Sequence, residues 1–168
     1  MMKIMKYGMF AAATLLTIVL SAQNSKTLPD ATVKTLDGKS VQIKNYVGKG
    51  KITILSFWAT WCAPCKREMD AIAEVYGDWK DNYDVQYLAV TIDTQRDLPK
   101  VKPMVATKGW EYTILSDAAN QLKNALNFQT IPQTYLIDQK GNIVYEHTGY
   151  NPGDELDLEE KIKMLAKK

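Results

Sequence analysis

Cys62 and Cys65 are the only cysteines in the chain, separated by Ala63 and Pro64. A pair at this spacing can be a structural disulfide, half of a metal site or a redox couple. As a staple, such a four-residue loop would contribute only about 1.9 kcal/mol, against about 3 kcal/mol for a fifteen-residue loop. A zinc site needs about four ligands, and the chain adds a single histidine, His147, within a predicted strand. The pair therefore favours thiol–disulfide chemistry, with no metal or other cofactor expected.

The residues around the cysteines predict how they are positioned. Residues 52–57 are apolar or β-branched, which is typical of a strand buried on both faces. After Cys62, apolar residues recur at helical spacing, which predicts a helix over 63–80. Cys62 should lie at the helix start, where free N–H groups and the helix dipole lower the pKa of a thiol. Cys65 falls one turn further along, and Pro64 is tolerated in a first turn. We therefore expect an attacking thiol, Cys62, at the surface and a resolving thiol, Cys65, behind it.

The rest of the chain alternates strands and helices. A hairpin is predicted over 33–43, with Asp37-Gly38 at its turn. The other predicted strands are 85–92, 112–115, 133–137 and 143–147, and the other predicted helices are 98–108, 118–126 and 155–168. Pro103 should kink or split its helix, and residues 23–31 are expected to be loose. This order predicts an α/β fold with helices on both faces of the sheet.

The beginning of the chain indicates export. Lys3 and Lys6 precede an uncharged, mostly apolar run over 9–20, and small residues follow that run. We interpret residues 1–22 as a secretory signal peptide and residues 23–168 as one domain. The apolar run is short for a transmembrane helix, which needs about 20 residues, so an uncleaved membrane anchor is the alternative. We expect a periplasmic protein, in a compartment where disulfides persist.

Charge excludes one class of partner. The chain has 21 lysines and arginines and 19 acidic residues, and Lys3 and Lys6 account for the excess. The remaining chain is formally neutral and has no basic stripe, so we expect no nucleic-acid partner.

The segment FWATWCAPC, residues 57–65, closely resembles the active-site segment of the thioredoxin superfamily. The leader, the hairpin LDGKSVQIKNYVGK and the segment IPQTYLIDQKGNIVYEHTGY resemble the exported TlpA/ResA-like branch, and the resemblance covers residues 28–165. It implies a thioredoxin fold, in which helices flank a central mixed β-sheet and an N-terminal β-hairpin extends it. It also implies that Ile131-Pro132 is a cis peptide that faces the CxxC motif and lines the substrate groove.

The resemblance also directs attention to a proton acceptor. Many thioredoxins carry a buried acid on the strand beneath the first cysteine, but this chain has Ser56 at that position. The nearest candidate is Glu68, three residues after Cys65, where TlpA/ResA-like proteins also carry a glutamate. We interpret Glu68 as the acceptor of the Cys65 proton, directly or through water. A surface acid that pairs with a lysine is the alternative.

Aromatic residues beside the motif suggest a binding surface. We interpret Trp61 as a partly exposed lid over the disulfide and a platform for substrate. Pro64, Ile131 and Pro132 complete the predicted substrate-binding residues. Trp58, at the strand end, is expected to pack in the core.

These features predict an exported thiol–disulfide oxidoreductase that reduces client disulfides. The resemblance implies disulfide-containing clients, which can include apocytochrome c, and a membrane electron donor that re-reduces the pair. A thiol peroxidase of the peroxiredoxin branch is one alternative. That chemistry expects a threonine three residues before the reactive cysteine and a proline further up, where this chain has Ala59 and Leu55. A non-catalytic thioredoxin-fold binding module is the other alternative, and the intact WCAPC motif argues against it.

Overall fold

The computed structural model describes residues 26–167, so the predicted signal peptide lies outside the described residues. The strands are β1 (Lys26–Thr27), β2 (Thr32–Thr35), β3 (Ser40–Gln42), β4 (Ile52–Trp58), β5 (Val85–Thr91), β6 (Thr113–Ser116), β7 (Gln133–Ile137) and β8 (Asn142–Thr148). The α-helices are α1 (Ala63–Tyr83), α2 (Val101–Lys108), α3 (Gln121–Leu126) and α4 (Asp154–Ala166), with short 3-10 helices at Ile43–Asn45 and Leu98–Lys100. No helix in this part of the chain is both long and apolar enough to cross a membrane.

The described strands form one eight-stranded sheet, in the order β1-β8-β7-β4-β5-β6-β2-β3. β4 pairs in parallel with β5, and β5 with β6, whereas β7 is antiparallel to both β4 and β8. The hairpin β2–β3 extends the sheet through an antiparallel pair between β2 and β6. At its turn Gly38 has φ of 85°, a conformation that glycine adopts at little cost. The predicted mixed sheet with an N-terminal hairpin extension is confirmed.

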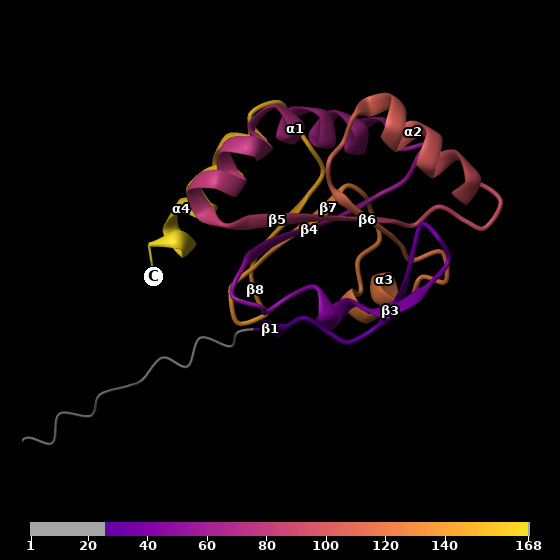
Figure 1. Ribbon diagram of the computed structural model, residues 1–168, viewed down its shortest axis with the longest axis horizontal. Helices are drawn as coiled ribbons and strands as arrows, with labels where there is room; N and C mark the ends of the chain where they lie inside the picture. Colours follow the sequence, from indigo (N-terminus) through magenta and orange to yellow (C-terminus); the bar gives the residue numbers. More distant parts are fainter. Residues whose placement is uncertain (1–25, 168) are drawn as a thin grey trace, which may run out of the picture.

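Helices cover the two faces of the sheet unequally. α1, α2 and α4 lie on one face, and α3 lies on the other, together with the N-terminal segment that contains β3 (Figure 1). β4 runs through the middle of the sheet, and each of its residues is buried. Its apolar sequence follows from this position, because both of its faces pack against covered core.

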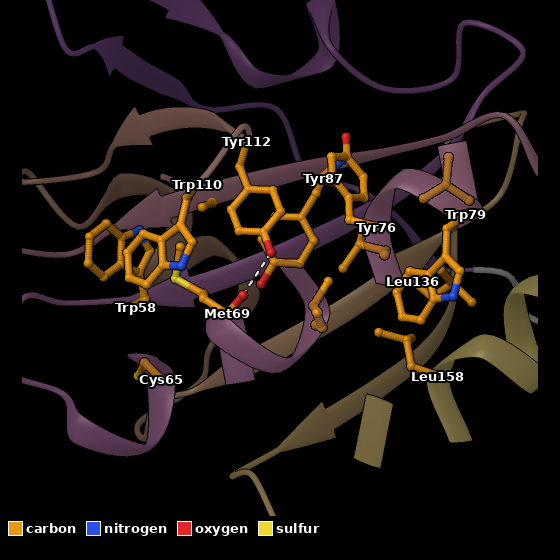
Figure 2. Packing of buried hydrophobic residues seen from close by; sticks show 14 of the residues in the cluster. Trp58, Cys65, Met69, Tyr76, Trp79, Tyr87, Trp110, Tyr112, Leu136 and Leu158 are labelled. Carbon is orange, nitrogen blue, oxygen red and sulfur yellow. Dashed lines mark hydrogen bonds between the residues drawn. The ribbon is translucent and has the colours of Figure 1, made fainter. Parts of the chain in front are cut away.

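Buried aromatic side chains pack between the sheet and α1. Trp58 and Trp110 pack edge to face with ring centroids 5.4 Å apart, and the Tyr87 and Tyr112 rings stack at 4.2 Å (Figure 2). The Tyr112 hydroxyl also donates a hydrogen bond to the carbonyl oxygen of Met69 in α1, at 2.7 Å. Trp58 is a core residue, as predicted. The Tyr112–Met69 hydrogen bond ties the segment before β6 to the second turn of α1, which follows the turn that carries Cys65.

Two local predictions need correction, and one is confirmed. Residues 26–31 are ordered, because β1 pairs with β8 and Leu28, the single large apolar residue of the 23–31 stretch, is buried. The 98–108 helix is split, as predicted, and Pro103 falls in the first turn of α2, where an N–H is not needed. α3 begins later than predicted, at Gln121, since Asn120 before it adopts a left-handed conformation with φ of 55°.

Candidate active site

Cys62 and Cys65 lie where β4 has ended and α1 begins. Cys62 is the N-cap of α1, and its Sγ accepts a hydrogen bond from the backbone N–H of Cys65 at 3.3 Å. Pro64 lies in the first turn, as its missing N–H allows. The two sulfurs form a disulfide, with the Cα atoms 5.4 Å apart. When the disulfide is reduced, the helix N-terminus favours the thiolate form of Cys62.

Access to the disulfide is narrower than the sequence predicts. Cys62 is only 4% exposed and Cys65 is fully buried, so the expected surface position of Cys62 is wrong. The reason is that the Cys62 side chain turns inward to cap α1. The adjoining Trp61 is 63% exposed, and Pro64 is half-buried. Of the two cysteines, only Cys62 keeps any exposed surface, and it adjoins the exposed Trp61.

The loop before β7 faces the first cysteine. The Ile131-Pro132 peptide bond is cis, which confirms the prediction. The Ile131 carbonyl oxygen lies 3.9 Å from the Cys62 Sγ. In the disulfide this is a contact only, whereas in the reduced protein the thiol can donate a weak hydrogen bond to that oxygen. Ile131, Pro132 and Cys62 thus form one continuous region.

A buried acid that sequence analysis did not single out holds the loop before the motif. Asp93, just beyond β5, accepts hydrogen bonds from the Thr60 backbone N–H and hydroxyl, both at 2.8 Å, and from the Thr91 hydroxyl at 2.6 Å. The Lys66 ammonium group donates to the Thr60 carbonyl oxygen from the other side, at 3.0 Å. The position of Asp93 in the sequence could have identified it. Asp93 follows β5 and Thr60 follows β4, and these parallel strands end side by side.

Glu68 is a buried acid behind the disulfide. It lies three residues after Cys65, hence on the same side of α1, and is only 5% exposed. The Thr134 hydroxyl donates to its carboxylate at 2.7 Å and the Ser56 hydroxyl at 3.3 Å. Burial raises the pKa of Glu68 to about 7, although the hydrogen bonds from Thr134 and Ser56 oppose that rise. The alternative of a surface acid paired with a lysine is wrong, because the carboxylate lies inside the protein.

Ser56 and Thr134 show how the fold supplies this acid. β4 and β7 are antiparallel neighbours, and Ser56 and Thr134 lie directly opposite each other in the register. Ser56 therefore does not replace the buried acid of many thioredoxins, but donates to an acid that comes from α1 instead. Thr134 was missed, since a threonine within a strand carries no distinguishing sequence signal.

Among residues 26–167, no three or more histidine, cysteine, aspartate or glutamate side chains form a group that could hold a metal ion. The cysteine sulfurs are bonded to each other in the structure.

Solved structures with the same fold carry matching descriptions. An uncharacterized thioredoxin-like protein from Porphyromonas gingivalis is 43% identical, with a TM-score of 0.75 over 86% of this chain and 95% of that one. A thiol:disulfide interchange protein of the thioredoxin family from Chlorobium tepidum TLS is 26% identical, with a TM-score of 0.67 over 84% of this chain and 97% of that one. The fold and the CxxC site thus define a thiol–disulfide oxidoreductase with a thioredoxin fold.

Sequence relatives give the family. The chain belongs to the AhpC/TSA family, whose pattern matches residues 25–146. Thiol-disulfide oxidoreductase ResA from Bacillus thuringiensis subsp. konkukian is 30% identical over 141 residues, which cover 84% of this chain and 78% of the relative. The predicted resemblance to ResA-like proteins is confirmed, and the chain is an enzyme of this oxidoreductase class.

Proposed function

We propose that this enzyme is exported and acts as a reductant of disulfides in client proteins. The observation that carries the proposal is the asymmetry of the pair: Cys62 caps α1 beside exposed Trp61, whereas Cys65 is fully buried on the side of Glu68. The signal-peptide pattern of residues 1–22 supports export to the periplasm, with an uncleaved anchor as the alternative.

The reaction follows from the two positions. The Cys62 thiolate attacks one sulfur of the client disulfide, which forms a mixed disulfide and releases the other client sulfur as a thiolate that takes up a proton. The Cys65 thiolate then attacks the Cys62 sulfur, closes the Cys62–Cys65 disulfide and releases the second client sulfur. Two electrons pass to the client, whose two sulfurs end as thiols.

Glu68 is proposed as the proton acceptor for Cys65. A thiol must lose its proton before it can attack, and Cys65 is shut off from solvent. A carboxylate with a pKa of about 7 can accept a proton and release it again near neutral pH. Its place three residues along the same helix puts it on the Cys65 side rather than the client side.

The client surface is proposed to consist of Trp61, Pro64 and Ile131, together with Pro132, whose side chain is buried next to Ile131. Trp61 offers an exposed ring for packing against an apolar client side chain. The Ile131 carbonyl oxygen, next to Cys62, is placed to meet client backbone as the sulfurs approach. Disulfide-containing proteins are the proposed clients, with apocytochrome c among them, and a membrane protein is the proposed electron donor.

The direction of electron flow is argued from the residues between the cysteines. Ala63 and Pro64 offer no histidine or other side-chain donor to the Cys62 thiolate. A strongly oxidising couple, at about −120 mV, depends on a stabilised reduced form. We therefore expect a potential of roughly −200 to −280 mV, measured by equilibration with glutathione. A value near −120 mV would make the protein an oxidant and contradict the proposed direction.

Cysteine variants test the division of roles. We expect Cys62→Ser to abolish insulin reduction, and Cys65→Ser to accumulate mixed disulfides on Cys62, detected by mass spectrometry. Cys62→Ser is the matched control, because the thiol that it leaves is buried and should trap no client. Equal trapping by both variants would refute the roles. Peroxide turnover without insulin reduction would favour the peroxidase alternative, and client binding without turnover would favour the binding module.

A further inference from the structure

A small cavity adjoins Glu68. Its polar lining comes from α1, β7, β8, α4 and the loop before α4, and consists of Glu68, Thr134, Tyr145, His147, Tyr150, Asp154 and Glu155. About 10 Å³ is open to the centre of a water molecule, which is room for about one water. With several hydrogen-bonding groups around it, the cavity is polar enough to hold that water.

His147 and Asp154 form a pair on the solvent side of this cavity. The His147 Nε2 and an Asp154 carboxylate oxygen are 3.0 Å apart, and their side chains are 33% and 25% exposed. His147 lies directly opposite Thr134 in the β7–β8 register, so both side chains lie on the same face of the sheet. Thr134 in turn donates to Glu68. A polar path thus runs from Glu68, which is 5% exposed, to the partly exposed His147–Asp154 pair.

We propose that this cavity is the route by which Glu68 exchanges its proton with solvent, and that the His147–Asp154 pair controls the exchange. The inference rests on the proposed role of Glu68. After Cys65 has given its proton to Glu68, the acid must lose that proton before the next cycle. One water in the cavity can take the proton from the Glu68 carboxyl group and pass it to the His147–Asp154 pair, which releases it to solvent. His147 and Asp154 are positioning residues, since neither touches a reacting sulfur.

Four of the other ionisable groups near Glu68 are tyrosines, and the fifth is Glu155. Burial raises the pKa of Tyr87 on β5, of Tyr112 before β6 and of Tyr145 on β8, and it raises the pKa of Tyr150 to about 12. Glu155 is engaged by the Tyr150 hydroxyl at 2.9 Å and by the Gly153 N–H at 3.1 Å. The His147–Asp154 pair is therefore the element best placed to act on Glu68, because it lines the cavity and is itself partly exposed.

The two members of the pair act on Glu68 in opposite directions. The positive charge of protonated His147 lowers the pKa of Glu68, and the negative charge of Asp154 raises it. Replacing each member separately should therefore shift the Glu68 titration to opposite sides. A purely structural role would give no such change of sign.

The experiment follows the Glu68 carboxyl group by infrared spectroscopy after a pH jump, in the oxidised full chain. Glu68→Gln identifies the signal. We expect His147→Gln to raise the midpoint by about half a unit and to slow deprotonation about tenfold, and Asp154→Asn to lower the midpoint by a similar amount. Asp157→Asn is the matched control, because this exposed acid lies on the same helix but does not line the cavity.

The outcomes separate this inference from the proposed function. If neither variant differs from Asp157→Asn in midpoint or rate, or both midpoints move in the same direction, the cavity route is wrong. Asp154 also accepts a hydrogen bond from the Asn151 N–H, so Asp154→Asn can disturb the fold locally. His147→Gln tests the route independently, because it leaves that hydrogen bond in place. The oxidised protein has no free thiol, so the result does not depend on thiol exchange. If the midpoints move as expected but Glu68→Gln leaves thiol exchange unchanged, the cavity route stands and the role of Glu68 falls.

Discussion

Two buried carboxylates lie near the CxxC motif, and their surroundings differ. Asp93 receives three hydrogen bonds, of which one comes from a backbone N–H and two from hydroxyl groups. Glu68 receives two, both from hydroxyl groups, and the one from Ser56 is long at 3.3 Å. A buried carboxylate stays ionised only when hydrogen bonds or opposite charges replace the water it has lost. Asp93 is well supplied with donors, whereas Glu68 is not, and burial raises the pKa of Glu68 to about 7.

This difference matches the roles proposed for the two acids, in which Asp93 is structural and Glu68 accepts a proton. Asp93 uses its bonds to hold Thr60, two residues before Cys62, so it fixes the loop that leads into the motif. Glu68 holds nothing in the loop and lies instead between buried Cys65 and a polar cavity. Under the proposed function, the number and kind of donors distinguish the two acids, since both are buried.

The largest expected effect is on the resolving step. Glu68→Gln removes the proposed proton acceptor of Cys65 and should slow closure of the Cys62–Cys65 disulfide about a hundredfold near neutral pH. Rapid-quench measurement of mixed-disulfide decay checks this, and its pH profile should lose the step near pH 7. The pH profile of Asp93→Asn, measured under conditions where this variant is fully folded, should retain the step near pH 7. A profile unchanged in Glu68→Gln would leave both acids with structural roles.

Glu68 should lower the free energy of unfolding at the pH values where it supports activity. In the folded oxidised protein the pKa of Glu68 is about 7, against an ordinary value of 4.5. Below pH 4.5 the carboxyl group is protonated in both states and costs nothing. Between these values only the unfolded chain ionises, so stability falls as pH rises, and above pH 7 the loss reaches about 3 kcal/mol.

Glu68→Gln should therefore stabilise the oxidised protein by up to about 3 kcal/mol above pH 7, with the gain vanishing below pH 4.5. Urea unfolding at a series of pH values between 4 and 8 measures it. The neutral amide keeps both hydroxyl contacts within reach, which is why it is chosen over alanine. A gain that does not change with pH would mean that the glutamate is not the titrating group.

Asp93→Asn should have the opposite sign. The amide nitrogen would face N–H and O–H donors, so at least one buried donor loses its acceptor, at a cost of about 1–3 kcal/mol. The same urea series measures the loss, and Asp84→Asn at an exposed ion pair is a matched control with little expected change. If Asp93→Asn and Glu68→Gln changed stability alike at pH 8, the contrast between the two acids would not hold.

The elements that carry the site could be predicted from the sequence, but the hydrogen-bond donors around Glu68 and Asp93 could not. The CxxC motif, the buried strand before it and the helical spacing after it placed Cys62, Cys65 and Glu68 on the correct elements. Those signals are local. The donors to Glu68 come from β4 and β7, and those to Asp93 from the loop after β4 and from Thr91, so they depend on pairings that local periodicity does not encode. The sequence did not predict that the Cys62 side chain turns inward, because several kinds of residue can cap the start of a helix and nothing local selects Cys62.

The smallest expected effect comes from removing one hydrogen-bond donor to Glu68 at a time. The Thr134 hydroxyl, at 2.7 Å, is the stronger donor to Glu68, so Thr134→Val should raise the pKa of Glu68 by about one unit in the oxidised protein. Ser56→Ala removes the longer bond of 3.3 Å and should raise it less. Carbon-13 NMR titration of the labelled Glu68 carboxyl group measures both shifts. A larger shift in Ser56→Ala, or a fall in either variant, would mean that hydroxyl donors do not set the proton affinity of Glu68 and that the contrast with Asp93 has another origin.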